Sequence, residues 1–139
     1  ERKGIHLSAA IPSDMPPLAA DRERIERVLV NLLDNALKYG RPNGRIRIDF
    51  GREEDHLRFD IWNEGQGQSP ERLERLFDKF VRFGSQLDGS RGTGLGLFIS
   101  NRIAEAHGGK AFIAEEPRHL GFPRPRHTND RDNFHNGLL

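Results

Sequence analysis

The chain has 139 residues, of which 35% are hydrophobic and 31% are charged, a balance typical of a soluble globular protein with one sizeable core. Its 22 basic and 21 acidic groups nearly cancel, so no overall field favours nucleic acid or an anionic membrane, and we expect contact with neither. Cysteine is absent, which excludes disulfides, thiolate nucleophiles and the usual zinc sites.

The start of the chain predicts a strand. Apolar residues occupy every second position of residues 5–11, as in a half-buried strand, and Pro12 ends the pattern. Because the sequence begins abruptly in this segment, we expect it to be a fragment of a longer protein. No apolar run approaches the roughly 20 residues of a membrane span, and no signal-peptide pattern is present. A cytoplasmic fragment is expected, and a membrane-anchored parent is compatible with it.

The strongest pattern in the chain is a helix over residues 21–39. Its apolar residues recur at steps of three and four, which predicts a face packed on a core. They are Ile25, Val28, Leu29, Leu32, Leu33, Ala36 and Leu37. Asp21 is a suitable N-cap and Gly40 a suitable residue just past the C-terminus.

One edge of this helix carries polar groups. At roughly 100° per residue, Asn31, Asn35 and Lys38 fall within about 60° of one another, along the border of the apolar face. An amide oxygen is a ligand suited to Mg²⁺ and an ammonium group suits phosphate, so this edge could hold a metal-bound polyphosphate. The alternative is an ordinary solvated helix edge.

Two alternating segments follow, residues 45–50 and 57–61, and predict an antiparallel hairpin. Ser69 and Pro70 then mark the start of a short helix. Residues 81–91 contain few apolar anchors and predict a mobile loop.

Glycines cluster at two junctions. Gly65 and Gly67 lie between a strand and a helix, where they permit close backbone approach to a ligand, although an ordinary turn is the more frequent meaning of such a pair. Gly92, Gly94 and Gly96 precede the last helix, where free backbone N–H groups form a natural phosphate cradle.

The order of elements predicts the fold class. A strand over residues 110–115 completes the series strand, helix, two strands, helix, loop, helix, strand. A two-layer α/β sandwich, with about three helices on one face of a mixed sheet, would bury each one-sided pattern. We assign residues 1–116 to this domain and expect residues 117–139 to be an atypical, poorly ordered tail.

Four motifs in order carry a family resemblance. Residues 31–39 resemble the N box, 63–67 the first glycine box, 77–80 the F box and 92–97 the second glycine box of the catalytic and ATP-binding domain of bacterial two-component sensor histidine kinases. The resemblance covers about residues 4–116 and implies the Bergerat ATP-binding fold.

The resemblance also implies a site for Mg²⁺ and ATP. Asn35 would ligate Mg²⁺, Asn31 and Lys38 would contact phosphate or metal-bound water, and Tyr39 would lie against the nucleotide. Asn63 would face the adenine amino group. The other implied nucleotide contacts are Gly65 and Gly67 near the base, Gly92, Thr93, Gly94, Leu95 and Gly96 beneath the phosphates, and Arg82 and Arg91 from the loop. Phe77 and Phe80 are expected to anchor the loop in the core.

The chain departs from the family pattern in three ways. The family's final strand, after the double glycine, is not evident beyond Glu116. The first glycine box usually opens with Asp, and here Asn63 takes its place; its amide oxygen can still accept a hydrogen bond from adenine. None of the six histidines lies in the helical pattern that presents the phosphorylated histidine, so the acceptor domain is expected elsewhere. No residue of this chain is assigned as a catalytic acid or base.

The sequence leaves three functions open, one leading and two alternative. In the leading one, the chain supplies the γ-phosphate of Mg²⁺–ATP to a histidine on the dimerisation domain of its parent kinase, and indirectly serves a response regulator. An ATP-hydrolysing relative would carry Glu at the position of Asn31 to activate water, and an amide cannot act as that base. The third is a non-catalytic module that senses nucleotide.

Overall fold

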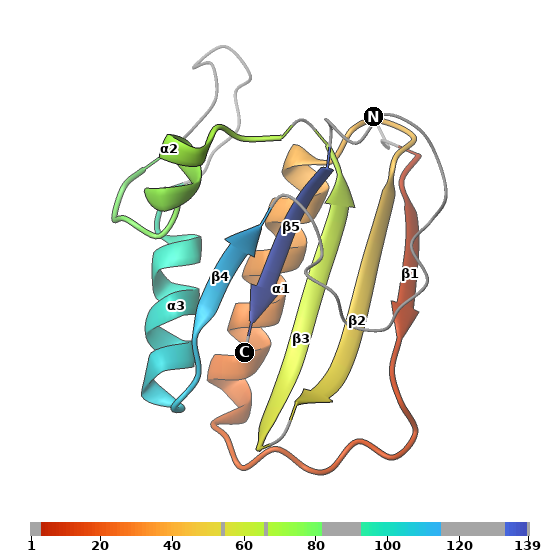
Figure 1. The fold of residues 1–139 in the computed structure, drawn as a ribbon, viewed down its shortest axis with the longest axis vertical. Helices are drawn as coiled ribbons and strands as arrows, with labels where there is room; N and C mark the ends of the chain where they lie inside the picture. Colours follow the sequence, from red (N-terminus) through yellow and green to blue (C-terminus); the bar gives the residue numbers. More distant parts are fainter. Residues whose placement is uncertain (1–3, 54, 66, 82–92, 115–132, 139) are drawn as a thin grey trace.

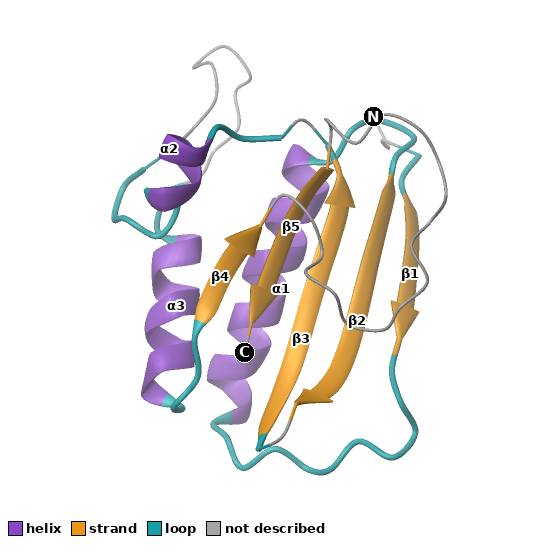
Figure 2. Ribbon diagram, in the orientation of Figure 1, coloured by secondary structure: helices purple, strands orange, loops and turns teal. Residues whose placement is uncertain are grey.

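The computed structural model describes residues 4–53, 55–65, 67–81, 93–114 and 133–138. The elements in chain order are β1 (His6–Ala10), α1 (Arg22–Tyr39), β2 (Arg45–Glu53), β3 (His56–Glu64), α2 (Pro70–Glu74), α3 (Gly96–Ala106), β4 (Ala111–Ala114) and β5 (Asn133–Leu138). Figures 1 and 2 show a sheet with α1 behind it and α3 beside β4. The predicted two-layer α/β sandwich with a mixed sheet is confirmed.

Within the described residues, the sheet has five strands in the order β1-β2-β3-β5-β4. β1 runs parallel to β2, and the other neighbouring pairs are antiparallel. β2 and β3 form the predicted hairpin, with Ile48 opposite Ile61 and Phe50 opposite Phe59. Because side chains alternate along a strand, this register places the apolar residues of both strands on the face that α1 covers.

α1 forms as its sequence pattern predicts. The carboxylate of Asp21 accepts a hydrogen bond from the backbone N–H of Arg24 at 3.1 Å, which satisfies one of the free donors at the helix start. Val28, Leu32 and Ala36 are buried against the sheet, one turn apart, and form one core with residues of β2, β3 and α3. This stripe fixes which edge of α1 remains available for a ligand.

Gly40 ends α1, but for a different reason from the one expected. A glycine just past a helix usually adopts a left-handed conformation, whereas Gly40 is extended with φ −65°. Its N–H still donates to the Ala36 carbonyl at 2.9 Å. A Cβ at this position would lie 2.6 Å from that same carbonyl oxygen, so close packing excludes a side chain here.

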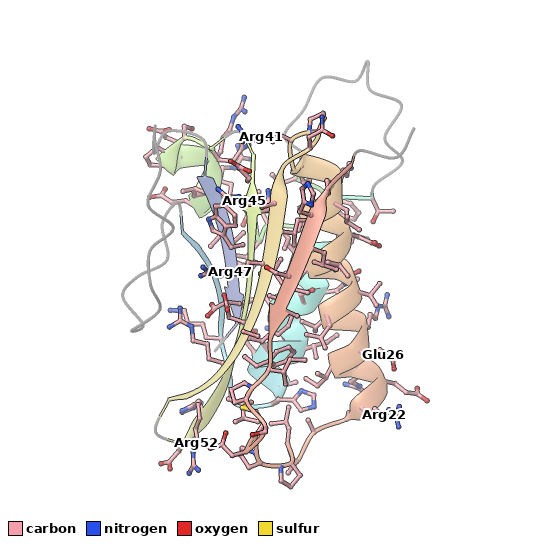
Figure 3. All side chains as sticks on the ribbon, turned by 90° about the vertical axis from the view of Figure 1, so that its right-hand side faces the viewer. Arg22, Glu26, Arg41, Arg45, Arg47 and Arg52 are labelled. Carbon is pink, nitrogen blue, oxygen red and sulfur yellow. The ribbon has the colours of Figure 1, made fainter. Side chains whose placement is uncertain are left out.

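The outer face of the sheet carries a row of arginines. Figure 3 shows Arg41, Arg45 and Arg47 on the side of the sheet that faces away from α1. All three are paired with carboxylates: Arg41 and Arg45 share Glu64, at 2.5 and 3.6 Å, and Arg47 pairs with Asp49 at 2.5 Å. The row is therefore not an uncompensated basic surface.

The expectation of a half-buried first strand is wrong in one respect. All five residues of β1 are exposed, and Leu7 is 59% exposed. β1 is an edge strand, and α1 packs over β3 near the middle of the sheet, so α1 does not cover β1. Only Ile5, just before β1, packs against the core.

The expectation of a poorly ordered tail is also wrong in part. Residues 133–138 form β5, which pairs with both β3 and β4 and so completes the middle of the sheet. Period-two alternation is absent from this segment, which is why the sequence did not predict the strand. Residues 117–132 and 139 lie outside the described residues, as does most of the loop predicted to be mobile, from residue 82 to 91.

The lower ends of α1 and α3 are joined through His107. Its Nε2 accepts from the backbone N–H of Asp21 at 3.1 Å, which requires the hydrogen to sit on Nδ1. Nδ1 then donates to the Ile103 carbonyl at 2.8 Å. The His107 imidazole therefore links the C-terminus of α3 to the N-terminus of α1 through two hydrogen bonds.

We predict that His107→Ala lowers the free energy of unfolding by about 1 kcal/mol, because it removes two hydrogen bonds in a partly solvated setting. Urea unfolding followed by circular dichroism measures the change. His6→Ala is the matched control, since the His6 side chain is exposed on the edge strand and should change stability by less than about 0.5 kcal/mol. Equal effects of the two substitutions would contradict this role for His107.

Candidate functional site

The polar edge of α1 lies where the sequence predicted it. Asn31, Asn35 and Lys38 are all half-buried, between the buried stripe and the exposed face that carries Asp34. Two amides and one ammonium group therefore line the border of the core. Tyr39 follows them and is 44% exposed, with the Lys38 Nζ 5.1 Å from the centre of its ring.

Asn31 connects this edge to the start of α3. Its Nδ2 donates to the Gly96 carbonyl and to the Ser100 hydroxyl, each at 3.4 Å. Ser100 is completely buried, so its hydroxyl has little access to solvent. The sequence did not single out Ser100, because a lone serine in a helix has no distinctive pattern; only its position, one turn after Gly96, could have indicated it.

The start of α3 presents unpaired backbone donors. The N-cap is Leu95, whose side chain cannot cap the helix, and the first turn contains no acidic residue. The N–H groups of the first turn, beginning at Gly96, consequently have no partner within the helix. Such a terminus favours an anion such as phosphate, and it lies beside the amide edge of α1 through the Asn31 contact.

Gly94 shapes the approach to this terminus. It adopts a left-handed backbone with φ +70°, and a Cβ there would lie 2.9 Å from the Val81 carbonyl oxygen. The Gly94 carbonyl accepts from the N–H of Phe80 at 3.1 Å. The predicted F box and second glycine box are thus brought into direct contact.

The expectation that both F-box phenylalanines anchor the core is wrong for Phe80. Phe77 is half-buried, whereas Phe80 is 71% exposed and has a positive φ of 63°. The hydrogen bond from its backbone to Gly94 holds this conformation, which turns the ring away from the core. Lys79 lies between these two phenylalanines in the sequence, and its ammonium group is 4.9 Å from the ring centre of Phe98 on α3.

The end of β3 lies next to the end of α1 and holds another predicted nucleotide contact, Asn63. Asn63 is 0% exposed, and neither its Nδ2 nor its Oδ1 has a hydrogen-bond partner among the described residues. A buried amide in this state costs free energy, so it indicates a position completed by a ligand or by solvent.

Gly65 joins the end of β3 to the end of α1. It forms a β-bridge with Gly40, and a Cβ on Gly65 would lie 2.6 Å from the Tyr39 carbonyl oxygen and 3.0 Å from Asn63 Nδ2. The missing side chain thus allows the end of α1 and the unpaired amide of Asn63 to be neighbours. Gly67, two residues further along the chain, is half-buried.

The remaining predicted contacts divide into two groups. Thr93 is exposed and Leu95 half-buried, next to the start of α3. Arg82, Arg91 and Gly92 lie outside the described residues. The structure therefore brings the α1 edge, the β3 end and the α3 start together, and leaves the loop arginines as predictions.

The donor set suits a metal that arrives with a ligand. Among the described residues, no group of three His, Cys, Asp or Glu side chains could hold a metal ion. An amide such as that of Asn35 can contribute one oxygen, and phosphate oxygens and water would supply the others, as Mg²⁺ usually requires. The residues present fit this ion better than zinc.

The start of α2 shows one shifted ionisation. The pKa of Glu71 lies below its usual range, first because its own backbone N–H donates to the carboxylate and then because the Ser69 hydroxyl does. Ser69 lies at the N-cap position of α2, where the sequence predicted the helix to start, but its side chain makes no hydrogen bond to the helix backbone. Its hydroxyl is directed to Glu71 instead.

Comparison with known proteins adds independent findings. A family model described as "Histidine kinase-, DNA gyrase B-, and HSP90-like ATPase" matches residues 20–128. The Sensor protein KdpD of Clostridium acetobutylicum is 40% identical over 109 residues, which is 78% of this chain but 12% of that protein. The chain therefore spans only a small part of this curated relative. In the part of the chain that the structure describes, no helix is long and apolar enough to cross a membrane.

Solved structures agree with this match. The catalytic domain of the histidine kinase ThkA is 28% identical and superposes with a TM-score of 0.75, covering 98% of this chain and 78% of that one. Full-length ShkA in complex with AMPPNP is 26% identical with a TM-score of 0.74, covering 98% of this chain and 25% of that one.

We predict that Gly65→Ala lowers the free energy of unfolding by about 2 kcal/mol, because the added methyl group would overlap the Tyr39 carbonyl oxygen. Gly51→Ala is the control: nothing lies within 4 Å of its Cβ position on β2, so the change should be within about 0.5 kcal/mol. Thermal unfolding of both variants measures the change in the free energy of unfolding. A Gly65→Ala protein as stable as Gly51→Ala would show that Gly65 does not lie in close contact with the Tyr39 carbonyl oxygen.

Proposed function

Because this chain belongs to the histidine kinase-, DNA gyrase B- and HSP90-like ATPase family, we propose that it binds Mg²⁺–ATP and presents the γ-phosphate to a histidine on another domain of its parent protein. That domain would be the dimerisation domain of a sensor histidine kinase. The chain covers only part of the relatives that it matches, and the acceptor would lie in the remainder.

One observation supports this proposal most directly. Asn31, on the polar edge of α1 that also carries Asn35 and Lys38, donates hydrogen bonds to Gly96 and Ser100 of α3, where the first backbone N–H groups have no partner within the helix. Phosphoryl transfer depends chiefly on positioning and charge neutralisation, and these are the groups that such a reaction needs.

Each part of the site then has a task. The start of α3 would bind phosphate oxygens through backbone N–H groups, and Lys38 would balance their charge. Asn35 would hold Mg²⁺, which supplies charge neutralisation at the phosphates when bound. Tyr39 and the end of β3 would position the base, so that the γ-phosphate stays at the open side of the site.

ATP hydrolysis is the weaker alternative. The amide of Asn31 already donates to Gly96 and Ser100, and an amide cannot accept a proton from water at neutral pH. A chain with these groups would protect the γ-phosphate from water until an acceptor arrives. A module that only senses nucleotide is the other alternative, and it would bind ATP without supporting transfer in the parent protein.

The partners follow from the same proposal. ShkA has been solved in complex with AMPPNP, and ThkA in complex with the response regulator protein TrrA. By analogy, a nucleotide would occupy this site, and a response regulator would receive the phosphoryl group from the parent protein after the histidine.

We predict that the isolated chain binds Mg²⁺–ATP and Mg²⁺–ADP but shows almost no self-phosphorylation, because the acceptor histidine lies elsewhere. Calorimetric titration measures binding, and incubation with γ-³²P-ATP measures transfer. The parent protein, with its preceding domain, should become labelled on histidine under the same conditions. Stable label on the isolated chain that is lost on mutating His6 or His107 would contradict the proposal, as would the absence of nucleotide binding.

We predict that Asn35→Ala weakens nucleotide binding by about tenfold or more with Mg²⁺ but by less than about threefold with EDTA, because the lost oxygen is a metal ligand. The fold should persist, since Asn35 lies beside the buried stripe and not in it. The same titrations of Glu26→Ala, an exposed position near the other end of α1, serve as a control. Equal losses with and without Mg²⁺ would assign Asn35 to the base or to folding.

A further inference from the structure

Asn63 is the most unusual polar residue in the described part of the chain. It is completely buried, and both of its amide atoms lack a hydrogen-bond partner there. Buried polar side chains are normally satisfied, and an orphan amide is costly enough to require an explanation. Its place at the end of β3, next to the end of α1, puts it among the predicted nucleotide contacts already described.

We propose that Asn63 makes this site tolerant of both adenine and guanine nucleotides, an inference that rests on the proposed nucleotide binding. The amide offers one donor and one acceptor side by side. Adenine presents a donor at its 6-amino group next to an acceptor at N1, and guanine presents the reverse pair, an acceptor at O6 next to a donor at N1. Rotation of the amide by about 180° exchanges Oδ1 and Nδ2, so the same side chain complements either edge.

The surroundings of Asn63 leave this rotation open. No hydrogen bond from a described residue fixes which atom is Oδ1 and which is Nδ2. The adjacent Gly65 contributes no side chain that could select one orientation, and the Cβ position there is 3.0 Å from Nδ2. The ligand would therefore determine the orientation of the amide.

A carboxylate at this position would behave differently. It can only accept hydrogen bonds, so it would favour the amino group of adenine and repel the O6 of guanine. Hydrogen bonds to a charged group are also stronger than neutral ones. The asparagine therefore gives weaker selection for adenine than an aspartate in the same place.

Competition titrations with ATP and GTP, at a fixed Mg²⁺ concentration, test this inference on the full chain. The native protein should bind both nucleotides, and Asn63→Asp should increase the preference for ATP over GTP by about fivefold. Asn43→Asp makes the same chemical change in an exposed turn and should leave the preference unaltered. If Asn63→Asp still binds ATP and its preference for ATP over GTP is unchanged, the inference about Asn63 is overturned, but the proposed function is not. Failure of the native protein to bind either nucleotide would overturn the proposed function with it.

A second variant covers the case in which a buried aspartate prevents folding. Asn63→Leu has a similar shape without polar atoms, so the unliganded protein should be as stable as the native one or more stable, because the orphan amide is gone. Its affinity for ATP and for GTP should fall by similar factors. A lower stability of Asn63→Leu in urea would show that Asn63 supports the fold. A loss of affinity for ATP but not for GTP would show that Asn63 contacts adenine only.

Discussion

The contact between Gly40 and Gly65 is the constraint on which the site depends. It joins the end of α1 to the end of β3, and neither glycine has room for a side chain: a Cβ would lie 2.6 Å from a backbone oxygen at each position. Because the buried stripe of Val28, Leu32 and Ala36 fixes the rotation of α1, this contact also fixes its height on the sheet. Rotation and height together determine where the polar edge faces.

Much of this arrangement could be predicted from the sequence, because local patterns control it. The stripe and cap of α1, the β2–β3 hairpin and the start of α3 were all predicted by periodicity or by residues typical of helix ends. The exposure of β1 and the insertion of β5 between β3 and β4 depend on contacts between distant segments. Periodicity within one segment carries no information about which neighbours will cover it.

The residues of the candidate site also divide into those that local sequence patterns could predict and those that depend on contacts between distant segments. Asn31, Asn35 and Lys38 could be placed on one edge from helical geometry alone. The contact of Asn31 with the buried Ser100, the exposure of Phe80 and the unpaired amide of Asn63 all arise where two elements meet. These contacts set the alignment of α1 and α3 and leave a polar, unpaired amide at the end of β3, and the proposed nucleotide site depends on both.

Nuclear magnetic resonance of the ¹⁵N-labelled chain, titrated with Mg²⁺ and a non-hydrolysable ATP analogue, tests the central claim most directly. If the three segments form one nucleotide site, the largest shifts should fall on the amides of Asn35, Gly65 and Gly96, while those of Ala9 and Ala10, at the far end of the edge strand β1, stay in place. Shifts centred on β1, or on the hairpin turn around Asp55, would contradict the account.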